Sequence, residues 1–169
     1  LGSTTMSYKD VARKIAKLHI LYKETGIKPG DKIALCGKNS SQWCVAFIAT
    51  LTYGAVIVPI LADFKPDNIQ HLINHSDARL AIVDENIWEA LNPDGMTSIA
   101  GALCTRDFSL LHSNDEQLTH VRAHLNELFG QAYPDRFTPD HVDYYKEDRD
   151  ELCLISYTSG STGFSKGVM

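Results

Sequence analysis

Short apolar runs that favour β-strands alternate with segments whose apolar residues recur at helical spacing, and this alternation constrains the fold most. Helical patterns begin near residues 7, 40, 66, 84 and 115. The strand-like runs are residues 33–36, 55–61, 79–83, 98–103 and 152–156. Because parallel strands need a crossover of about a dozen residues or more, the pattern predicts an α/β fold with a largely parallel sheet covered by helices.

Local signals indicate where the helices begin and end. The helix over residues 43–53 is apolar on nearly all sides, so we expect other elements to cover both of its sides. The last helix is predicted over residues 115–129. Candidate N-terminal residues are Ser7 with Asp10 as its capping-box partner, Pro66 in a first turn, and Asp84 before a short helix. Glycines are expected to end three helices, at Gly26, Gly54 and Gly130.

Composition excludes several classes of protein. The 169 residues are 44% hydrophobic and 22% charged, which is typical of a globular domain. A net charge of -5 argues against nucleic-acid binding, which depends on clustered Lys and Arg. We see neither an apolar run long enough for a membrane span nor a signal peptide. The four cysteines lack metal-ligand spacing, so we expect reduced thiols and a cytoplasmic location.

The last strand-like run leads directly into Tyr-Thr-Ser-Gly-Ser-Thr-Gly-Phe-Ser-Lys-Gly, residues 157–167. Ligand sites in open α/β sheets lie beyond the carboxyl ends of strands. Closely spaced glycines allow backbone N–H groups to converge on an anion, and Lys166 adds a positive charge. The segment is not a Walker A loop, because Ser165 precedes the lysine and Gly167 follows it. A phosphate loop is the favoured interpretation, and a flexible Gly/Ser linker is the alternative.

Residues 157–168 resemble the phosphate-loop signature of the adenylate-forming enzymes, which include acyl-CoA synthetases and the adenylation domains of peptide synthetases. One departure is Ser165, where the family usually has proline. The segments that resemble the family elsewhere, in the family's order, are residues 26–34, Asn39-Ser40 with Trp43, residues 54–59 and residues 76–80.

The resemblance implies a two-step reaction, in which a carboxylate and ATP form an acyl-adenylate and coenzyme A then takes the acyl group, with Mg²⁺ as the metal. The phosphate-binding residues that it implies are Thr158, Ser159, Gly160, Ser161, Thr162, Gly163 and Lys166. Residues 60–64 most resemble long-chain fatty acyl-CoA ligases.

By this resemblance, residues 1–169 form only the N-terminal part of a large domain, and the catalytic, adenine, ribose, magnesium and acyl-binding residues lie beyond Met169. Since the chain begins at Leu1, we expect residues to precede it as well. We expect the chain alone to be inactive and to self-associate.

Two alternatives remain open at the sequence level. One is a non-catalytic nucleotide- or phosphate-binding α/β module, and the other is a structural domain with a Gly/Ser tail. The pairs His71–His75 and His120–His124 have helical spacing, but both lack the glutamate of a metalloprotease motif. Solvent-exposed histidines on helix surfaces are the favoured interpretation, rather than metal ligands.

Overall fold

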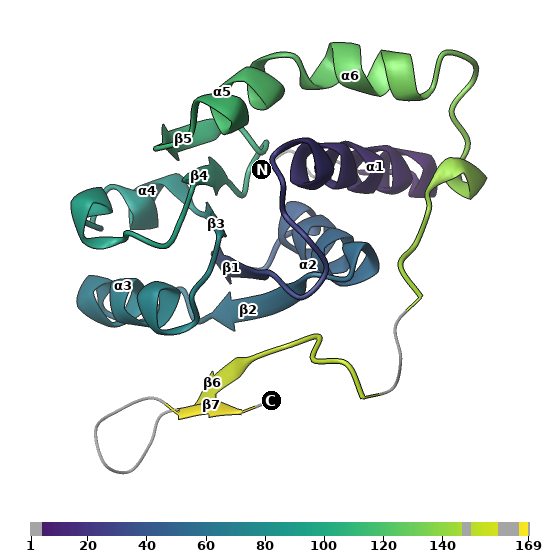
Figure 1. Ribbon diagram of the computed structural model, residues 1–169. Helices are drawn as coiled ribbons and strands as arrows, with labels where there is room; N and C mark the ends of the chain where they lie inside the picture. The colour runs from purple at the N-terminus through teal and green to yellow at the C-terminus, as the bar shows by residue number, and fades with distance from the viewer. Residues whose placement is uncertain (1–4, 147–149, 159–165, 169) are drawn as a thin grey trace.

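The computed structural model describes residues 5–146, 150–158 and 166–168. Its main body is a sheet of five strands in the order β2-β1-β3-β4-β5, with helices on both faces (Figure 1). The strands are β1 (Lys32–Cys36), β2 (Val56–Ile60), β3 (Leu80–Val83), β4 (Gly101–Cys104) and β5 (Leu110–Ser113). Strand β1 pairs in parallel with β2 and β3, and β3 pairs in parallel with β4, which confirms the predicted α/β fold.

In the described part of the chain, six α-helices connect and cover the strands. They are α1 (Tyr8–Glu24), α2 (Ser41–Tyr53), α3 (Pro66–His75), α4 (Glu85–Trp88), α5 (Glu116–Ala123) and α6 (Leu125–Ala132). Two 3₁₀ turns, η1 (Pro93–Gly95) and η2 (Pro139–His141), complete the connections. None of the helices in the described part of the chain is long and apolar enough to cross a bilayer.

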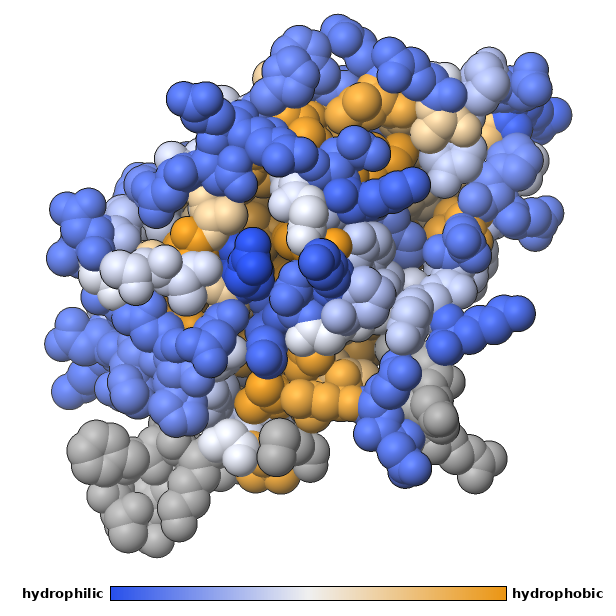
Figure 2. Space-filling model, viewed as in Figure 1, coloured by the Kyte–Doolittle hydropathy of each residue, from blue (hydrophilic) through white to orange (hydrophobic). Residues whose placement is uncertain are grey.

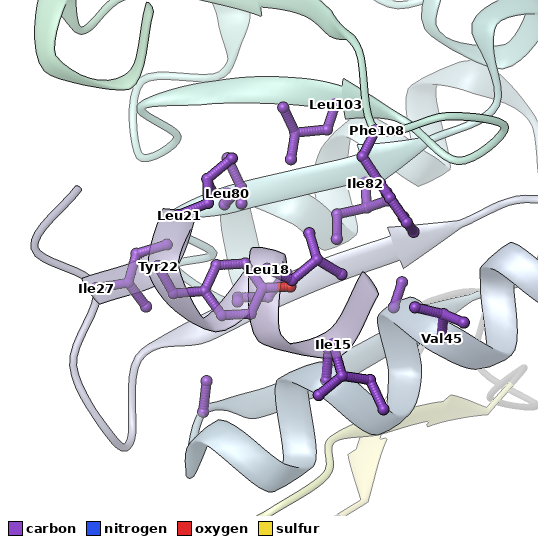
Figure 3. Packing of buried hydrophobic residues seen from close by; sticks show 14 of the residues in the cluster. Ile15, Leu18, Leu21, Tyr22, Ile27, Val45, Leu80, Ile82, Leu103 and Phe108 are labelled. Carbon is purple, nitrogen blue, oxygen red and sulfur yellow. The ribbon is translucent and has the colours of Figure 1, made fainter. Parts of the chain in front are cut away.

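Alternate residues of the strands supply two cores, one on each face of the sheet. Ile33 and Leu35 of β1 pack with α1, α2 and α5, whereas Ala34 and Cys36 pack with α3 and the α4 region. Figure 3 shows the first core, where Ile15, Leu18 and Tyr22 of α1 lie against the sheet. These parallel strands are buried on both faces, which explains why their sequences are continuous apolar runs.

Several predicted helix ends are confirmed. Ser7 and Asp10 form the predicted capping box, and Pro66 occupies the first turn of α3. Gly54 ends α2 in the left-handed conformation, with φ 85°. Gly130 does not end a helix, because α6 continues through it to Ala132. The prediction of one helix over residues 115–129 is also wrong, since the chain forms α5 and α6 with His124 between them.

The expected burial of α2 on both sides is wrong within the part of the chain that the structure describes. Val45 and Ala49 are buried against the sheet and α1. Cys44 and Ile48 lie on the outer side of the helix and are exposed. An apolar helix therefore leaves an apolar face in contact with solvent.

The segment at residues 152–156 is not a strand of the sheet, contrary to prediction. It runs parallel to β2 but makes a single bridge to it, between Leu154 and Ile57. The chain then forms β6 (Ser156–Thr158), which pairs in antiparallel fashion with β7 (Lys166–Val168). This two-stranded hairpin lies beside β2 at the edge of the molecule (Figure 1).

Candidate functional site

The hairpin of β6 and β7 holds the two ends of the predicted phosphate loop opposite each other. Thr158 on β6 pairs in register with Lys166 on β7. The other predicted loop residues, Ser159, Gly160, Ser161, Thr162 and Gly163, lie outside the described residues. The structure therefore brings together the backbone positions of the first hydroxyl residue and the lysine of the motif.

Tyr157 connects this hairpin to the main body of the protein. Its side chain is buried, and its hydroxyl lies 2.9 Å from Nδ1 of His75, at the end of α3. The two rings meet edge to face, with centroids 5.8 Å apart. Burial raises the pKa of Tyr157, and the negative charge of Asp77 raises it further, so the phenol keeps its proton at neutral pH. Tyr157 is thus a neutral hydrogen-bonding anchor directly before Thr158.

A cavity of about 660 Å³ lies beside the hairpin, at the carboxyl ends of β1 and β2. Three segments of the chain line it: the turn after β1, the end of β2 and strand β6. Its lining residues are Gly37, Lys38, Asn39, Trp43, Pro59, Ile60, Leu61, Ala62, Asp63, Ser156 and Tyr157. This edge of a parallel sheet is where ligands generally bind in open α/β folds. The cavity combines one cationic and one anionic side chain with apolar walls, so it can accept a ligand with both polar and apolar parts.

Asp84 organises the same edge of the sheet, a role that the sequence did not reveal. Its carboxylate accepts a hydrogen bond from the backbone N–H of Lys38, at 2.9 Å, and another from the hydroxyl of Thr105. It therefore ties together the turns that follow β1, β3 and β4. Asp84 is the N-cap residue of α4, as predicted, but its side chain makes no capping hydrogen bond. A Cβ on Gly37 would lie 2.6 Å from Oδ1 of Asp84, so the close approach requires glycine there.

The histidine pairs have different surroundings. His71 and His75 lie with ring centroids 5.7 Å apart on α3, and His75 also contacts Tyr157. The rings of His120 and His124 lie 4.3 Å apart, and Nδ1 of His124 is 2.9 Å from the carbonyl oxygen of His120. Within the described ranges, no three His, Cys, Asp or Glu residues are grouped closely enough to hold a metal ion. The described residues therefore give no support for a metal site at either histidine pair.

Comparison with known proteins shows which family the chain resembles in sequence. The family model described as "AMP-binding enzyme" matches residues 1–169. The chain is 26% identical over 163 residues to Long chain acyl-CoA synthetase 3 of Arabidopsis thaliana, and the match covers 96% of the chain and 24% of the relative. It is 28% identical over 165 residues to the nonribosomal peptide synthetase vlms of a Lecanicillium species, with 98% of the chain and 2% of the relative covered.

A solved structure gives the same picture of the fold. The anthranilate CoA ligase AuaEII, in complex with anthranoyl-AMP, superposes with a TM-score of 0.70 at 19% identity, covering 94% of this chain and 27% of that one. The chain spans about a quarter or less of the length of the curated relatives named above.

Proposed function

The chain belongs to the AMP-binding enzyme family, as the sequence resemblance had indicated, and from this membership we propose that it is the N-terminal part of an ATP-dependent ligase. The ligase would activate a carboxylate as an acyl-adenylate and transfer the acyl group to coenzyme A. Residues 1–169 would hold the phosphate end of ATP.

The observation that carries the proposal is the register of the hairpin. The pairing of Thr158 with Lys166 closes the base of the phosphate-loop motif at the carboxyl edge of the sheet. The hairpin also adjoins a cavity with polar and apolar walls. A hydroxyl-rich, glycine-rich segment with a lysine at its end supplies donors and positive charge for a polyphosphate.

In the proposed first step, a carboxylate oxygen of the substrate attacks the α-phosphorus of ATP. A bond forms between that oxygen and the phosphorus, and the bond to the bridging oxygen breaks, so that pyrophosphate leaves. Lys166 and the hydroxyls would stabilise the charge that accumulates on the leaving group. The donor residues would be Thr158, Ser159, Ser161, Thr162 and Lys166, with Gly160 and Gly163 allowing close approach of the backbone.

In the second step, the thiol of coenzyme A attacks the acyl carbon of the adenylate and releases its proton to solvent. A carbon–sulfur bond forms, and AMP leaves with the electron pair of the broken carbon–oxygen bond. Mg²⁺ would accompany the phosphates and neutralise part of their charge when bound. We assign no magnesium ligand among the residues that the structure describes, where no three-residue group fits a metal.

For the carboxylate we propose a long-chain fatty acid. Residues 60–64 resemble the corresponding segment of long-chain ligases, and this resemblance is the basis of the choice. The match to a plant long-chain acyl-CoA synthetase supports this choice, whereas the match to a peptide synthetase keeps amino acids as the competing substrates. A panel of fatty, aromatic and amino acids in an ATP–pyrophosphate exchange assay on the longer protein distinguishes them.

The central test is Lys166→Ala in the longer protein. Removal of one electrostatic donor to the leaving phosphates is expected to slow ATP–pyrophosphate exchange by about a hundredfold or more. Lys23→Ala is the matched control, because Lys23 is an exposed lysine in the last turn of α1. Exchange at the unmodified rate in Lys166→Ala would contradict the assigned role. ATP binding by the longer protein without exchange for any carboxylate would favour a non-catalytic nucleotide-binding module.

A further inference from the structure

We propose that His75 is a positioning residue for the phosphate loop, because its hydrogen bond to Tyr157 holds both arms of the hairpin that carries the loop. The contacts that support this inference are independent of the reaction. Its catalytic consequence rests on the function proposed above, namely ATP binding through Thr158 and Lys166.

The helix that carries His75 fixes its backbone, while its side chain is exposed at the surface beside Tyr157. It is the last residue of α3, whose inner side chains Ile69, Leu72 and Ile73 are at most 1% exposed. The helix end is closed by the backbone N–H of Ser76, which donates to the carbonyl of Leu72 at 3.0 Å. The packed inner face of α3 therefore fixes the backbone position from which His75 reaches Tyr157.

The first arm of the hairpin is attached through Tyr157 itself. Tyr157 immediately precedes Thr158, so a displacement of Tyr157 moves the first of the proposed phosphate-binding residues. The hydrogen bond to His75 spans 82 positions of the sequence. Within the described residues, it is the one hydrogen bond that joins β6 or β7 to the five-stranded body. The nearest other attachment is the bridge of Leu154 to Ile57, which lies before β6 begins.

The second arm is attached through the same ring. Gly167 pairs in register with Tyr157 and follows Lys166 directly. A Cβ built on Gly167 would lie 3.4 Å from Cε1 of Tyr157 and 3.2 Å from Cγ2 of Ile155. The backbone beside the lysine therefore packs closely against the tyrosine that His75 holds. One buried ring thus sets the positions of both ends of the motif relative to α3.

A part-buried tyrosine hydroxyl generally has a hydrogen-bond partner, so the hydrogen bond by itself is compatible with a purely structural role. The two roles differ in what they affect. A structural contact contributes to global stability, whereas a positioning contact contributes to the order of the hairpin and to the affinity for ATP. The test therefore separates local order and ATP dependence from unfolding.

Hydrogen–deuterium exchange on the 169-residue chain is the first measurement. His75→Leu and Tyr157→Phe each remove the hydrogen bond, and both are expected to speed exchange in the peptides that contain residues 156–158 and 166–168. His75→Asn keeps a hydrogen-bonding group near the position of Nδ1 and is expected to restore slow exchange. His120→Leu is the matched control, because it replaces an exposed helix histidine on α5. Unchanged exchange in the first two variants would overturn the inference.

Kinetics on the longer protein are the second measurement. His75→Leu and Tyr157→Phe are expected to raise the KM for ATP about fivefold, the effect of one net hydrogen bond, with the KM for the carboxylate unchanged. The double variant is expected to match either single variant, because both remove the same contact. Equal rises in both KM values, or none, would overturn the positioning role. A failure of Lys166→Ala to slow exchange would instead overturn the proposed function, and the hydrogen-exchange result would still stand.

Discussion

At the level of single residues, His19 shows how burial sets a protonation state. Its Nε2 lies 3.0 Å from the carbonyl oxygen of Ala49 and 3.1 Å from the hydroxyl oxygen of Thr52, so it joins α1 to α2. Burial lowers the pKa of His19 below its ordinary value of 6.5, and the hydrogen bond to Ala49 and the charge of Asp143 offset this only in part. The folded protein therefore favours the neutral ring.

This shift predicts a loss of stability in mild acid. Because the folded pKa lies below the unfolded one, the contribution of His19 is fully present above about pH 6.5 and declines as the pH falls below that value. The decline is at most about 1.4 kcal/mol per pH unit for one proton. Urea unfolding at pH 7.5 and 5.5 measures it. His19→Gln, which does not titrate, is expected to lose less stability, and His120→Leu to behave as the unmodified chain. An equal loss in His19→Gln would refute the assignment.

The cysteines differ in environment and so in expected reactivity. Burial, followed by the nearby charge of Asp84, raises the pKa of Cys36 to about 12, whereas Cys44 is exposed on α2. Since the thiolate is the reactive form, iodoacetamide at pH 8 is expected to modify Cys44 and leave Cys36 intact in the folded chain. Peptide mass spectrometry measures both sites. Modification of Cys36 at the rate of Cys44 under native conditions would show that the sheet edge opens readily.

At the level of elements, the break between α5 and α6 has a local cause. The ring Nδ1 of His124 lies 2.9 Å from the carbonyl oxygen of His120, which also accepts the backbone N–H of His124 at 3.1 Å. His124 shares this carbonyl between its ring and its backbone N–H and has φ -103° and ψ 13°, outside helical geometry, so one helix ends there and the next begins. The periodicity of apolar residues continues through the break, which is why the sequence indicated one helix.

Two glycines at helices give opposite predictions for the same substitution. Gly54 has φ 85°, and a Cβ there would lie 2.6 Å from the ring of Tyr145. Gly54→Ala is therefore expected to destabilise the chain by about 1–2 kcal/mol from the left-handed backbone, and by more from the clash. Gly130→Ala is the matched control, since Gly130 lies within α6 with nothing near its Cβ position. It is expected to stabilise the chain by about 0.5–1 kcal/mol. Chemical unfolding of both variants measures the difference, and a change of the same sign in both would contradict this account.

At the level of the whole molecule, apolar surface remains open to solvent. Leu61 is 63% exposed, Val168 53% and Ile48 42%. Figure 2 shows hydrophobic surface low in the view, where β2 and the segment leading into β6 lie in Figure 1. Strand β2 is also an edge of the five-stranded sheet. Apolar patches and strand edges of this kind promote association.

We therefore expect the 169-residue chain to self-associate at high concentration. Light scattering is expected to give a mass above that of the monomer, and the substitutions Leu61→Gln and Ile48→Lys to shift it towards the monomer. Tyr8→Gln is the matched control, because Tyr8 is 93% exposed at the start of α1. A monomeric mass at every concentration, without binding of a dye specific for apolar surface, would contradict the prediction.

Features that depend on neighbouring residues follow from the sequence alone. The capping box of Ser7 and Asp10, the first turn at Pro66 and the left-handed end at Gly54 result from local backbone chemistry. The alternation of apolar runs with helical segments indicates the parallel α/β architecture, because strands buried on both faces must be apolar throughout. The phosphate-loop motif likewise indicates the family, and the match over residues 1–169 confirms it.

Which distant segments meet depends on tertiary packing. Strand β5 pairs in antiparallel fashion with β4 although its residues are only half-buried, so its sequence lacks a strong apolar pattern. Residues 152–156 are apolar enough for a strand, yet they form one bridge to β2 because the chain turns away to pair β6 with β7. The contact of His75 with Tyr157 joins positions 82 residues apart. Such pairings depend on how packed elements orient their side chains. The local propensity of a segment does not contain this information.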